Sequence, residues 1–191
     1  YLLSKQPKNQ LEEKNILESL LLFPSIEFPP ERILDQTISC KNNHIKYLNL
    51  LVLSKTNLST LNSSYIEKLS KFLYGLSDPT VNYYLRLGCS RVVESLMPIF
   101  TAFKNDYFIT ALCRLLMDDD ESIRHSINYS CQSILPHPSD TLVALKYFAS
   151  MIGNKSLLKS TSNSDCGANG LFKKEQDNQF IDNILLNSLI N

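Results

Sequence analysis

The sequence predicts an all-α fold, and three observations support this prediction. Apolar residues recur at steps of three and four along most of the 191 residues, which is the period of amphipathic helices. No segment shows the alternation of apolar and polar residues that a half-buried strand would have. Hydrophobic residues make up 43% of the chain, which is enough for a packed core. The chain has only 5 glycines and 8 prolines, which disfavours a β-rich fold with many tight turns.

The predicted helices follow one another with short polar breaks. The first covers residues 11–22, and prolines in the segment 23–30 end it because proline is excluded from a helix interior. Further helices are predicted over residues 31–40, 43–55, 64–76, 80–97, 106–117, 121–135, 140–152 and 171–190. We therefore divide the chain into helical repeats (1–152), a flexible insertion without periodicity (153–169), and a C-terminal helix that packs on the last repeat (170–191).

A repeat of 42 residues is the strongest internal signal. The shift superposes Leu73 on Leu115, Asp78 on Asp120, Val81 on Ile123, Leu85 on Ile127, Cys89 on Cys131 and Val92 on Ile134. Each copy is a helix, a short acidic turn and a second helix, and a period near 40 with paired helices is typical of HEAT and armadillo repeats. We therefore expect a HEAT/armadillo-like α-solenoid of stacked antiparallel helix pairs, with Cys89 and Cys131 in equivalent inward positions.

The run of acidic residues 118–121 is the most obvious candidate metal site. Calcium loops place oxygen ligands at alternating positions with a glycine at the sharp turn, and this run has no glycine. We instead predict that Asp120 caps the helix that follows it. The same interpretation applies one repeat earlier to Asp78, which precedes Pro79 at a favourable first-turn position.

Other side chains that could bind a metal or catalyse a reaction do not form a recognisable pattern. His125, Cys131 and His137 are six residues apart, and a six-residue step turns a helical side chain by about 600°, so His125 and Cys131 point to different sides. His44 lies in a polar turn and is predicted to be solvated. The chain lacks a Gly-x-Ser-x-Gly elbow, a Cys–His signature and a phosphate-binding glycine loop. We expect no catalytic residue, metal site or cofactor in it.

The net charge and the cysteine pattern limit the cellular compartment and the classes of partner that we expect. The 19 basic and 19 acidic residues cancel, which argues against a stand-alone nucleic-acid binder. The 5 cysteines are scattered without a Cys-x-x-Cys pair, as in reducing compartments. No apolar run approaches the ~20 residues that span a bilayer. We therefore expect a cytoplasmic protein without membrane contact. Because it begins with Tyr1 and shows no signal-peptide pattern, we interpret it as part of a longer protein.

A row of polar residues is the candidate binding surface. Asn82, Arg86 and Ser90 are four residues apart on one predicted helix, and Arg124, Asn128 and Gln132 occupy the matching positions one repeat later. The second helices of successive pairs line one surface of a solenoid, so these residues, here called the polar ridge, are expected to lie opposite the apolar stripe. Their replacement should then leave stability unchanged. The polar ridge could be a solvated face, or it could bind a partner protein or an RNA backbone.

Three stretches of the second half of the chain carry a family resemblance. Residues 115–124 (LLMDDDESIR) combine leucines, an acidic run, an apolar residue and an arginine, and in residues 135–148 two prolines precede a helix with Ala144 and Phe148. Residues 171–182 (LFKKEQDNQFID) contain Leu171, Phe172, Glu175, Asn178, Phe180 and Asp182 in a characteristic order. Together these stretches resemble the C-terminal region of the THADA family of large helical-repeat proteins. Lys173, Lys174 and Gln179 depart from the family pattern.

The resemblance implies a non-catalytic regulatory scaffold. Members similar to the fungal branch partner an FtsJ-type methyltransferase and direct it to the 2'-O of nucleotide 32 in the tRNA anticodon loop. The methyl donor and the catalytic residues would belong to that partner, and tRNA could join the complex. The alternative is a generic HEAT/armadillo scaffold for protein interactions in transport, phosphatase or cytoskeletal assembly. A third, more distant alternative is an enzyme built on an all-α fold.

Overall fold

A computed structural model describes residue 7 and residues 9–131 of the chain. This part is all-helical, without strands apart from one isolated bridge between Ile26 and Thr56, and it confirms the predicted fold class for these residues. Its α-helices are α1 (Gln10–Leu21), α2 (Pro30–Ser39), α3 (Asn43–Ser54), α4 (Ser63–Leu76), α5 (Tyr83–Leu96), α6 (Asp106–Leu116) and α7 (Glu121–Cys131), with 3₁₀ segments η2 (Leu58–Thr60) and η3 (Met97–Phe103).

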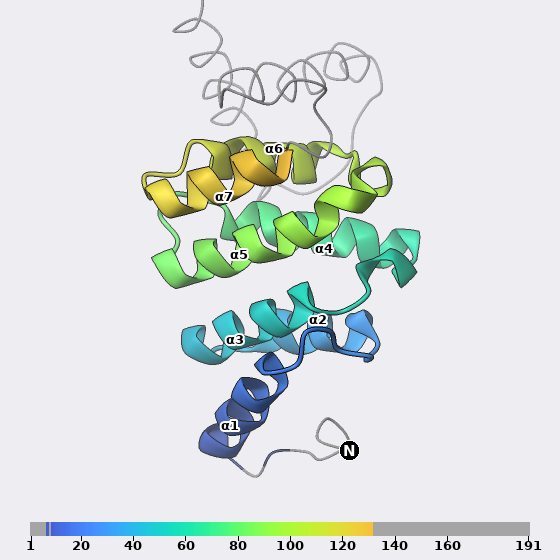
Figure 1. The fold of residues 1–191 in the computed structure, drawn as a ribbon, viewed down its shortest axis with the longest axis vertical. Helices are drawn as coiled ribbons and strands as arrows, with labels where there is room; N and C mark the ends of the chain where they lie inside the picture. The colour runs from blue at the N-terminus through green and yellow to red at the C-terminus, as the bar shows by residue number, and fades with distance from the viewer. Residues whose placement is uncertain (1–6, 8, 132–191) are drawn as a thin grey trace, which may run out of the picture.

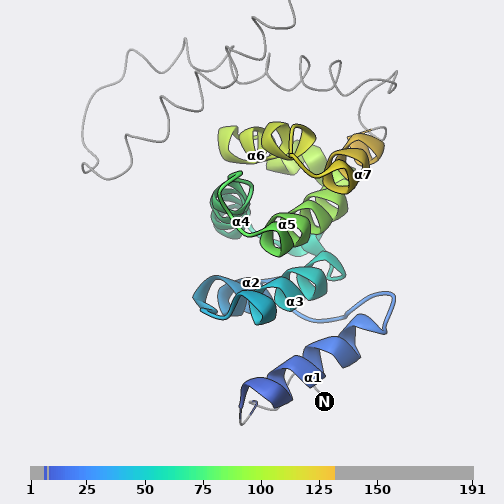
Figure 2. The ribbon, with the colours of Figure 1, turned by 90° about the vertical axis from the view of Figure 1, so that its left-hand side faces the viewer.

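The helices are stacked in two layers. Helices α2, α4 and α6 form one layer, and α3, α5 and α7 form the other (Figures 1 and 2). The chain crosses between the layers within each of the pairs α2–α3, α4–α5 and α6–α7, and each pair packs on the next through both layers. Helix α1 lies at one end of the stack and packs mainly on α3.

Asparagine side chains fix where most of these helices begin. The side-chain oxygens of Asn9, Asn42, Asn62, Asn82 and Asn105 accept backbone N–H groups in the first turns of α1, α3, α4, α5 and α6. Helix α2 begins with Pro30 instead, where the missing N–H removes no helical hydrogen bond. The described helix ends agree with the predicted bounds to within one residue, except at the start of α5; the predicted end of the last of these helices, residue 135, lies outside the described residues.

The start of α5 corrects one prediction. Asp78 Oδ1 accepts the N–H of Thr80 at 3.0 Å, but this caps only a short turn. Asn82 then takes a ψ of 136°, which ends that turn, and caps α5 by accepting the N–H of Tyr84 at 3.0 Å. In the later copy Asp120 does cap α7, since its Oδ1 accepts the N–H groups of Ser122 at 2.9 Å and Ile123 at 3.2 Å. The prediction is therefore confirmed for Asp120 and wrong for Asp78 as the cap of α5.

The core lies between the two layers and is closely packed. Cys89 and Cys131 are both fully buried, which confirms their equivalent inward positions. Gly88 allows α5 to approach α3, because a Cβ added there would lie 2.9 Å from Leu50 Cδ1. A side chain at position 88 would thus separate the two helices.

Several predictions fall beyond the residues that the structure describes. They concern the helices 140–152 and 171–190, the insertion 153–169, the domain boundaries at 152 and 170, and the side chains of Gln132 and His137. The family-like residues Leu171, Phe172, Glu175, Asn178, Phe180 and Asp182 also lie outside the described part. Among the described helices, none has both the length and the apolar composition that a membrane crossing requires.

Candidate interaction surface

Arg86 does not lie on an exposed ridge. Only 6% of the residue is exposed. Its Nε donates to Asp118 Oδ2 at 2.7 Å and its Nη2 donates to Asp118 Oδ1 at 3.1 Å, while Nη2 also pairs with Asp119. Nη1 donates to the backbone carbonyl of Val81 at 2.7 Å. The prediction of a solvent-facing Arg86 is wrong, because the guanidinium is enclosed between α5 and the turn that joins α6 to α7.

The remaining residues of the polar ridge do not form a continuous exposed surface either. Ser90 is fully buried and donates its hydroxyl to the carbonyl of Leu87 at 2.8 Å. Arg124 and Asn128 are half-buried, and Arg124 Nη1 donates to the carbonyl of Asp118 at 2.5 Å. Asn82 is exposed, at the cap of α5. Of the three predicted positions at α5, Arg86 and Ser90 are therefore buried, and only the cap residue Asn82 is exposed.

The pair of Arg86 with Asp118 keeps both groups charged. Burial opposes ionisation of Asp118, but hydrogen bonds from Arg86 and from the backbone N–H of Asp120 outweigh it, so the pKa of Asp118 lies below its usual value. The hydrogen bond to Asp118 in turn raises the pKa of Arg86. An ion pair with this geometry holds α5 to the α6–α7 turn.

A second buried arginine joins the same two helix pairs. It lies on the α6–α7 pair and contacts the α4–α5 pair, whereas Arg86 lies on the α4–α5 pair. Arg114 of α6 donates from Nη1 to the carbonyl of Tyr74 at 3.1 Å, at the end of α4. Its guanidinium carbon lies 4.5 Å from the centre of the Tyr74 ring, and Nη1 is 4.0 Å from Asp78 Oδ2. The turn between α4 and α5 is therefore bound to α6, as the turn between α6 and α7 is bound to α5.

The outer face of the layer α3/α5/α7 carries a different set of residues, here called the tyrosine cluster: Tyr47, Tyr83, Tyr84 and Arg91. The ring centres of Tyr47 and Tyr84 are 5.7 Å apart, and those of Tyr83 and Tyr84 are 5.3 Å apart. Tyr84 is 58% exposed and Tyr83 is 36% exposed. Burial raises the pKa of Tyr47, and the positive charge of Arg91 opposes this rise.

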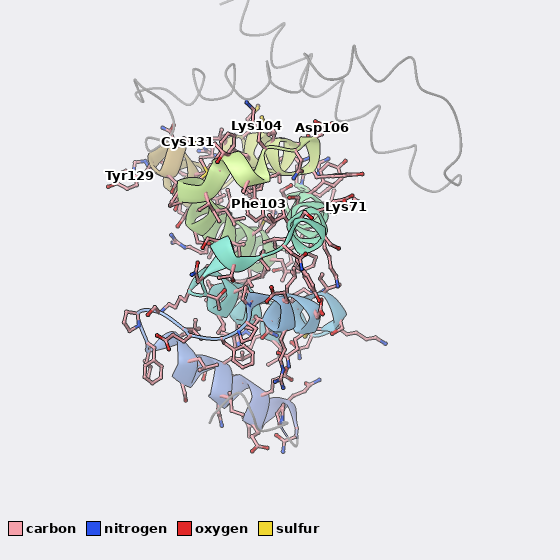
Figure 3. All side chains as sticks on the ribbon, turned by 90° about the vertical axis from the view of Figure 1, so that its right-hand side faces the viewer. Lys71, Phe103, Lys104, Asp106, Tyr129 and Cys131 are labelled. Carbon is pink, nitrogen blue, oxygen red and sulfur yellow. The ribbon has the colours of Figure 1, made fainter. Side chains whose placement is uncertain are left out.

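Arg91 also links the tyrosine cluster to α7. Its Nη1 donates to the two carboxylate oxygens of Glu94 at 3.0 and 3.2 Å and to the hydroxyl of Ser126 at 3.2 Å. Ser126 in turn bonds to Glu94. Tyr129, also on α7, points away from the other helices (Figure 3). Sequence reasoning missed this face, although two consecutive tyrosines directly after a helix cap are a signal that could have pointed to it.

The described residues also locate the side chains considered for metal binding and nucleophilic catalysis. His125 is exposed and Cys131 is fully buried, so the two face different sides as predicted, and His44 is exposed. No group of three or more His, Cys, Asp or Glu residues in the described part is arranged to hold a metal ion. Burial raises the pKa of Cys113 and of Cys131 to about 12, so both thiols stay protonated near neutral pH.

A shallow cleft of about 590 Å³ lies between the loop that follows α1 and the loop that follows α3. The backbone N–H of Ile26 donates to the carbonyl of Lys55 at 3.0 Å and joins these loops. Lys55 Nζ donates to the carbonyls of Leu21 at 2.5 Å and Phe23 at 2.9 Å, where it neutralises the C-terminal end of α1. The lysine that lines this cleft is therefore already used within the fold.

Comparisons of the chain with protein-family models, with curated proteins and with solved structures find no match.

Proposed function

We propose that the chain is a non-catalytic segment of a HEAT/armadillo-like solenoid that serves as the regulatory subunit of an FtsJ-type tRNA methyltransferase. In this role it would help to direct 2'-O-methylation to nucleotide 32 of the anticodon loop, with the methyl donor and the catalytic groups on the partner. The observation that carries the scaffold part of the proposal is the agreement between the 42-residue repeat and the stacking of two helix pairs.

The agreement extends to individual contacts. Asp78 and Asp120 are equivalent in the repeat, and each accepts a backbone N–H two residues later in the turn of its own pair. Cys89 and Cys131 are equivalent and fully buried. Repeats of this kind bury their apolar faces only by stacking on neighbours, which produces long surfaces for partners.

The buried arginines support a rigid scaffold rather than a loosely packed helical domain. A fold loses much stability when one partner of a buried ion pair is removed, so a shift of register that separated Arg86 from Asp118 would be costly. A binding surface that extends over several helix pairs requires such a fixed register, because its contact groups must keep their spacing.

The methyltransferase part of the proposal is supported by the THADA resemblance. One of its three stretches, residues 115–124, lies in the described part and forms the end of α6, the acidic turn and the start of α7. This stretch supplies Asp118 to the contact with Arg86, so its acidic residues have a structural role in the fold.

A purified-component experiment tests the proposal. The full chain, immobilised, should retain the FtsJ-type methyltransferase of the same organism and should not retain an FtsJ-type enzyme that modifies ribosomal RNA. The chain alone should show no binding of S-adenosylmethionine in calorimetry, whereas the complex should methylate tRNA at nucleotide 32. Absence of retention, or binding of the methyl donor by the chain alone, would contradict the proposal.

A further inference from the structure

Helix α6 carries two apolar stripes. The first contains Ala111 and Leu115, which occupy the positions of the core residues Leu69 and Leu73 of α4 one repeat earlier. The second, here called the outer stripe, has the same helical spacing and consists of Ile109, Leu112, Cys113 and Leu116. No residue of the outer stripe is more than 1% exposed. A helix that is apolar on more than one side has to be covered on each of them.

The 42-residue repeat indicates the direction in which the outer stripe faces. Its four residues correspond to Glu67, Ser70, Lys71 and Tyr74 of α4. Asn105, which caps α6, donates from Nδ2 to Ser70 Oγ at 2.9 Å. The ring centres of Tyr74 and Tyr107 are 5.6 Å apart, and Lys71 Nζ lies 5.5 Å from the centre of the Tyr107 ring. On α4 these positions thus face the following pair, so on α6 they face the place where a further pair would begin.

The described helices that pack most closely on α6 lie on its other sides. They are α4, which belongs to the preceding pair, and α7, which lies across the core in the other layer. Helices α6 and α7 form the last described pair at their end of the stack (Figures 1 and 2). The chain leaves the described part at Cys131, in this same pair. A cover for the outer stripe is therefore to be sought in the residues that follow.

The sequence after residue 131 contains a segment that fits this place. Its apolar residues recur at steps of three and four: Leu142, Leu145, Ala149 and Ile152. The connection 132–139 has the same length as 55–62, which leads from α3 back to the first layer at α4. We propose that residues 140–152 pack on the outer stripe of α6 as the first helix of a further pair. The end of the stack at α6 is then an internal junction of the solenoid, closed to partner proteins whatever their identity.

The rate at which N-ethylmaleimide labels Cys113 in the full chain tests this junction, because the Cys113 thiol belongs to the outer stripe. Labelling of the unchanged chain should be slow. Leu145→Asp puts a charge into the junction and should raise the rate by about tenfold or more, since local opening exposes the thiol. Ile184→Asp, the same kind of change in the predicted helix 171–190, is the control and should leave the rate unchanged. Fast labelling of the unchanged chain, no rise in Leu145→Asp, or a rise in Ile184→Asp alone would overturn the proposal.

Disulfide formation decides the question if Leu145→Asp unfolds the chain, which equally fast labelling of the buried Cys89 would reveal. Four single variants of the full chain place a thiol in the apolar stripe of the segment: Leu142→Cys, Leu145→Cys, Ala149→Cys and Ile152→Cys. A disulfide requires Cα atoms about 4.4–6.8 Å apart, so mild oxidation should join at least one of these thiols to Cys113, as mapped by mass spectrometry. Tyr147→Cys, on the opposite side of the predicted helix, is the control. Bonds to Cys113 from none of the four, or as readily from the control, would overturn the junction and leave the proposed function standing.

Discussion

The junction of α3 with α5 and the junction of α5 with α7 lie on opposite sides of one helix and differ in what holds them. At the first, Gly88 brings the backbone of α5 close to Leu50 and Tyr47, so shape complementarity determines the distance. At the second, Arg86 and Arg91 of α5 form charged hydrogen bonds with the α6–α7 turn and with Ser126. One helix can thus join its neighbours by packing on one side and by ion pairs on the other, and the two junctions should respond differently to mutation and to pH.

The largest effect is expected at the polar junction. Asp118→Ala leaves the Arg86 guanidinium buried without its carboxylate, which should lower the free energy of unfolding by about 3–5 kcal/mol, measured by urea denaturation. Asp119→Ala is the control, since the Asp119 side chain is 82% exposed and such pairs contribute about 0–1 kcal/mol. Equal effects of the two changes would show that the buried pair does not hold the junction. The same reasoning overturns the expectation that replacing Arg86 leaves stability unchanged.

A smaller loss is expected at the apolar junction. Gly88→Ala places a methyl group 2.9 Å from Leu50 Cδ1, and this overpacking should lower stability by about 1–3 kcal/mol. The control is Gly75→Ala in α4, where an added Cβ meets nothing within 4 Å, and helix propensity should raise stability by about 0.5–1 kcal/mol. Thermal denaturation of both variants would show opposite shifts. A stabilising Gly88→Ala would mean that α3 and α5 separate without penalty.

The turn that carries the polar junction also depends on its helix cap. Asp120→Ala removes the acceptor for the N–H groups of Ser122 and Ile123 and should lower stability by about 0.5–2 kcal/mol. Asp120→Asn keeps a capping oxygen and should retain most of the stability in the same chemical denaturation experiment. A calcium-dependent rise in melting temperature that Asp120→Ala abolishes would instead indicate a metal site at the turn.

The contributions of the two junctions to the free energy of unfolding should depend differently on pH. The pKa of Asp118 is lowered in the fold, so its contribution is fully present above the unfolded pKa and is lost as the pH falls through the lower, folded pKa. The stability difference between the unchanged chain and Asp118→Asn should therefore shrink in acid. The difference caused by Gly88→Ala should stay constant, because no titrating group takes part. Parallel urea titrations from about pH 7 to about pH 3 test this, and a constant Asp118→Asn difference would contradict the ionised pair.

Local sequence signals predicted the helices well, because the groups that start and end a helix lie within a few residues of one another. Asn42 and Asn62 precede apolar periodic segments and do cap α3 and α4. The repeat correctly placed Cys89 and Cys131 in the core. The start of α5 was less predictable, since Asp78 and Asn82 are both good capping residues and only the backbone geometry decides between them.

The candidate surface was harder to predict, because its residues gain their roles from distant parts of the chain. In the sequence nothing distinguishes Arg86 from a solvated arginine, because its partner Asp118 is adjacent to it only in the folded chain. The cluster of Tyr84 with Tyr47 likewise requires the adjacency of α5 and α3, which Gly88 makes close but which periodicity does not encode. Polar residues at helical spacing therefore identify a face, while the direction of stacking decides whether that face meets water.

The short sequence separation between Arg86 and Asp118 has a consequence for folding and for mechanical behaviour. Arg86 and Asp118 are 32 residues apart, and the side-chain contacts of Lys55 with Leu21, Arg91 with Ser126 and Arg114 with Tyr74 span 34, 35 and 40 residues. Each of these bonds thus joins one helix pair only to its neighbour. Loop closure over such short separations is fast, so folding can begin at any pair and spread outward. A pulling force applied to the ends of α1 and α7 should accordingly extend the stack one helix pair at a time, in a series of small steps rather than a single rupture.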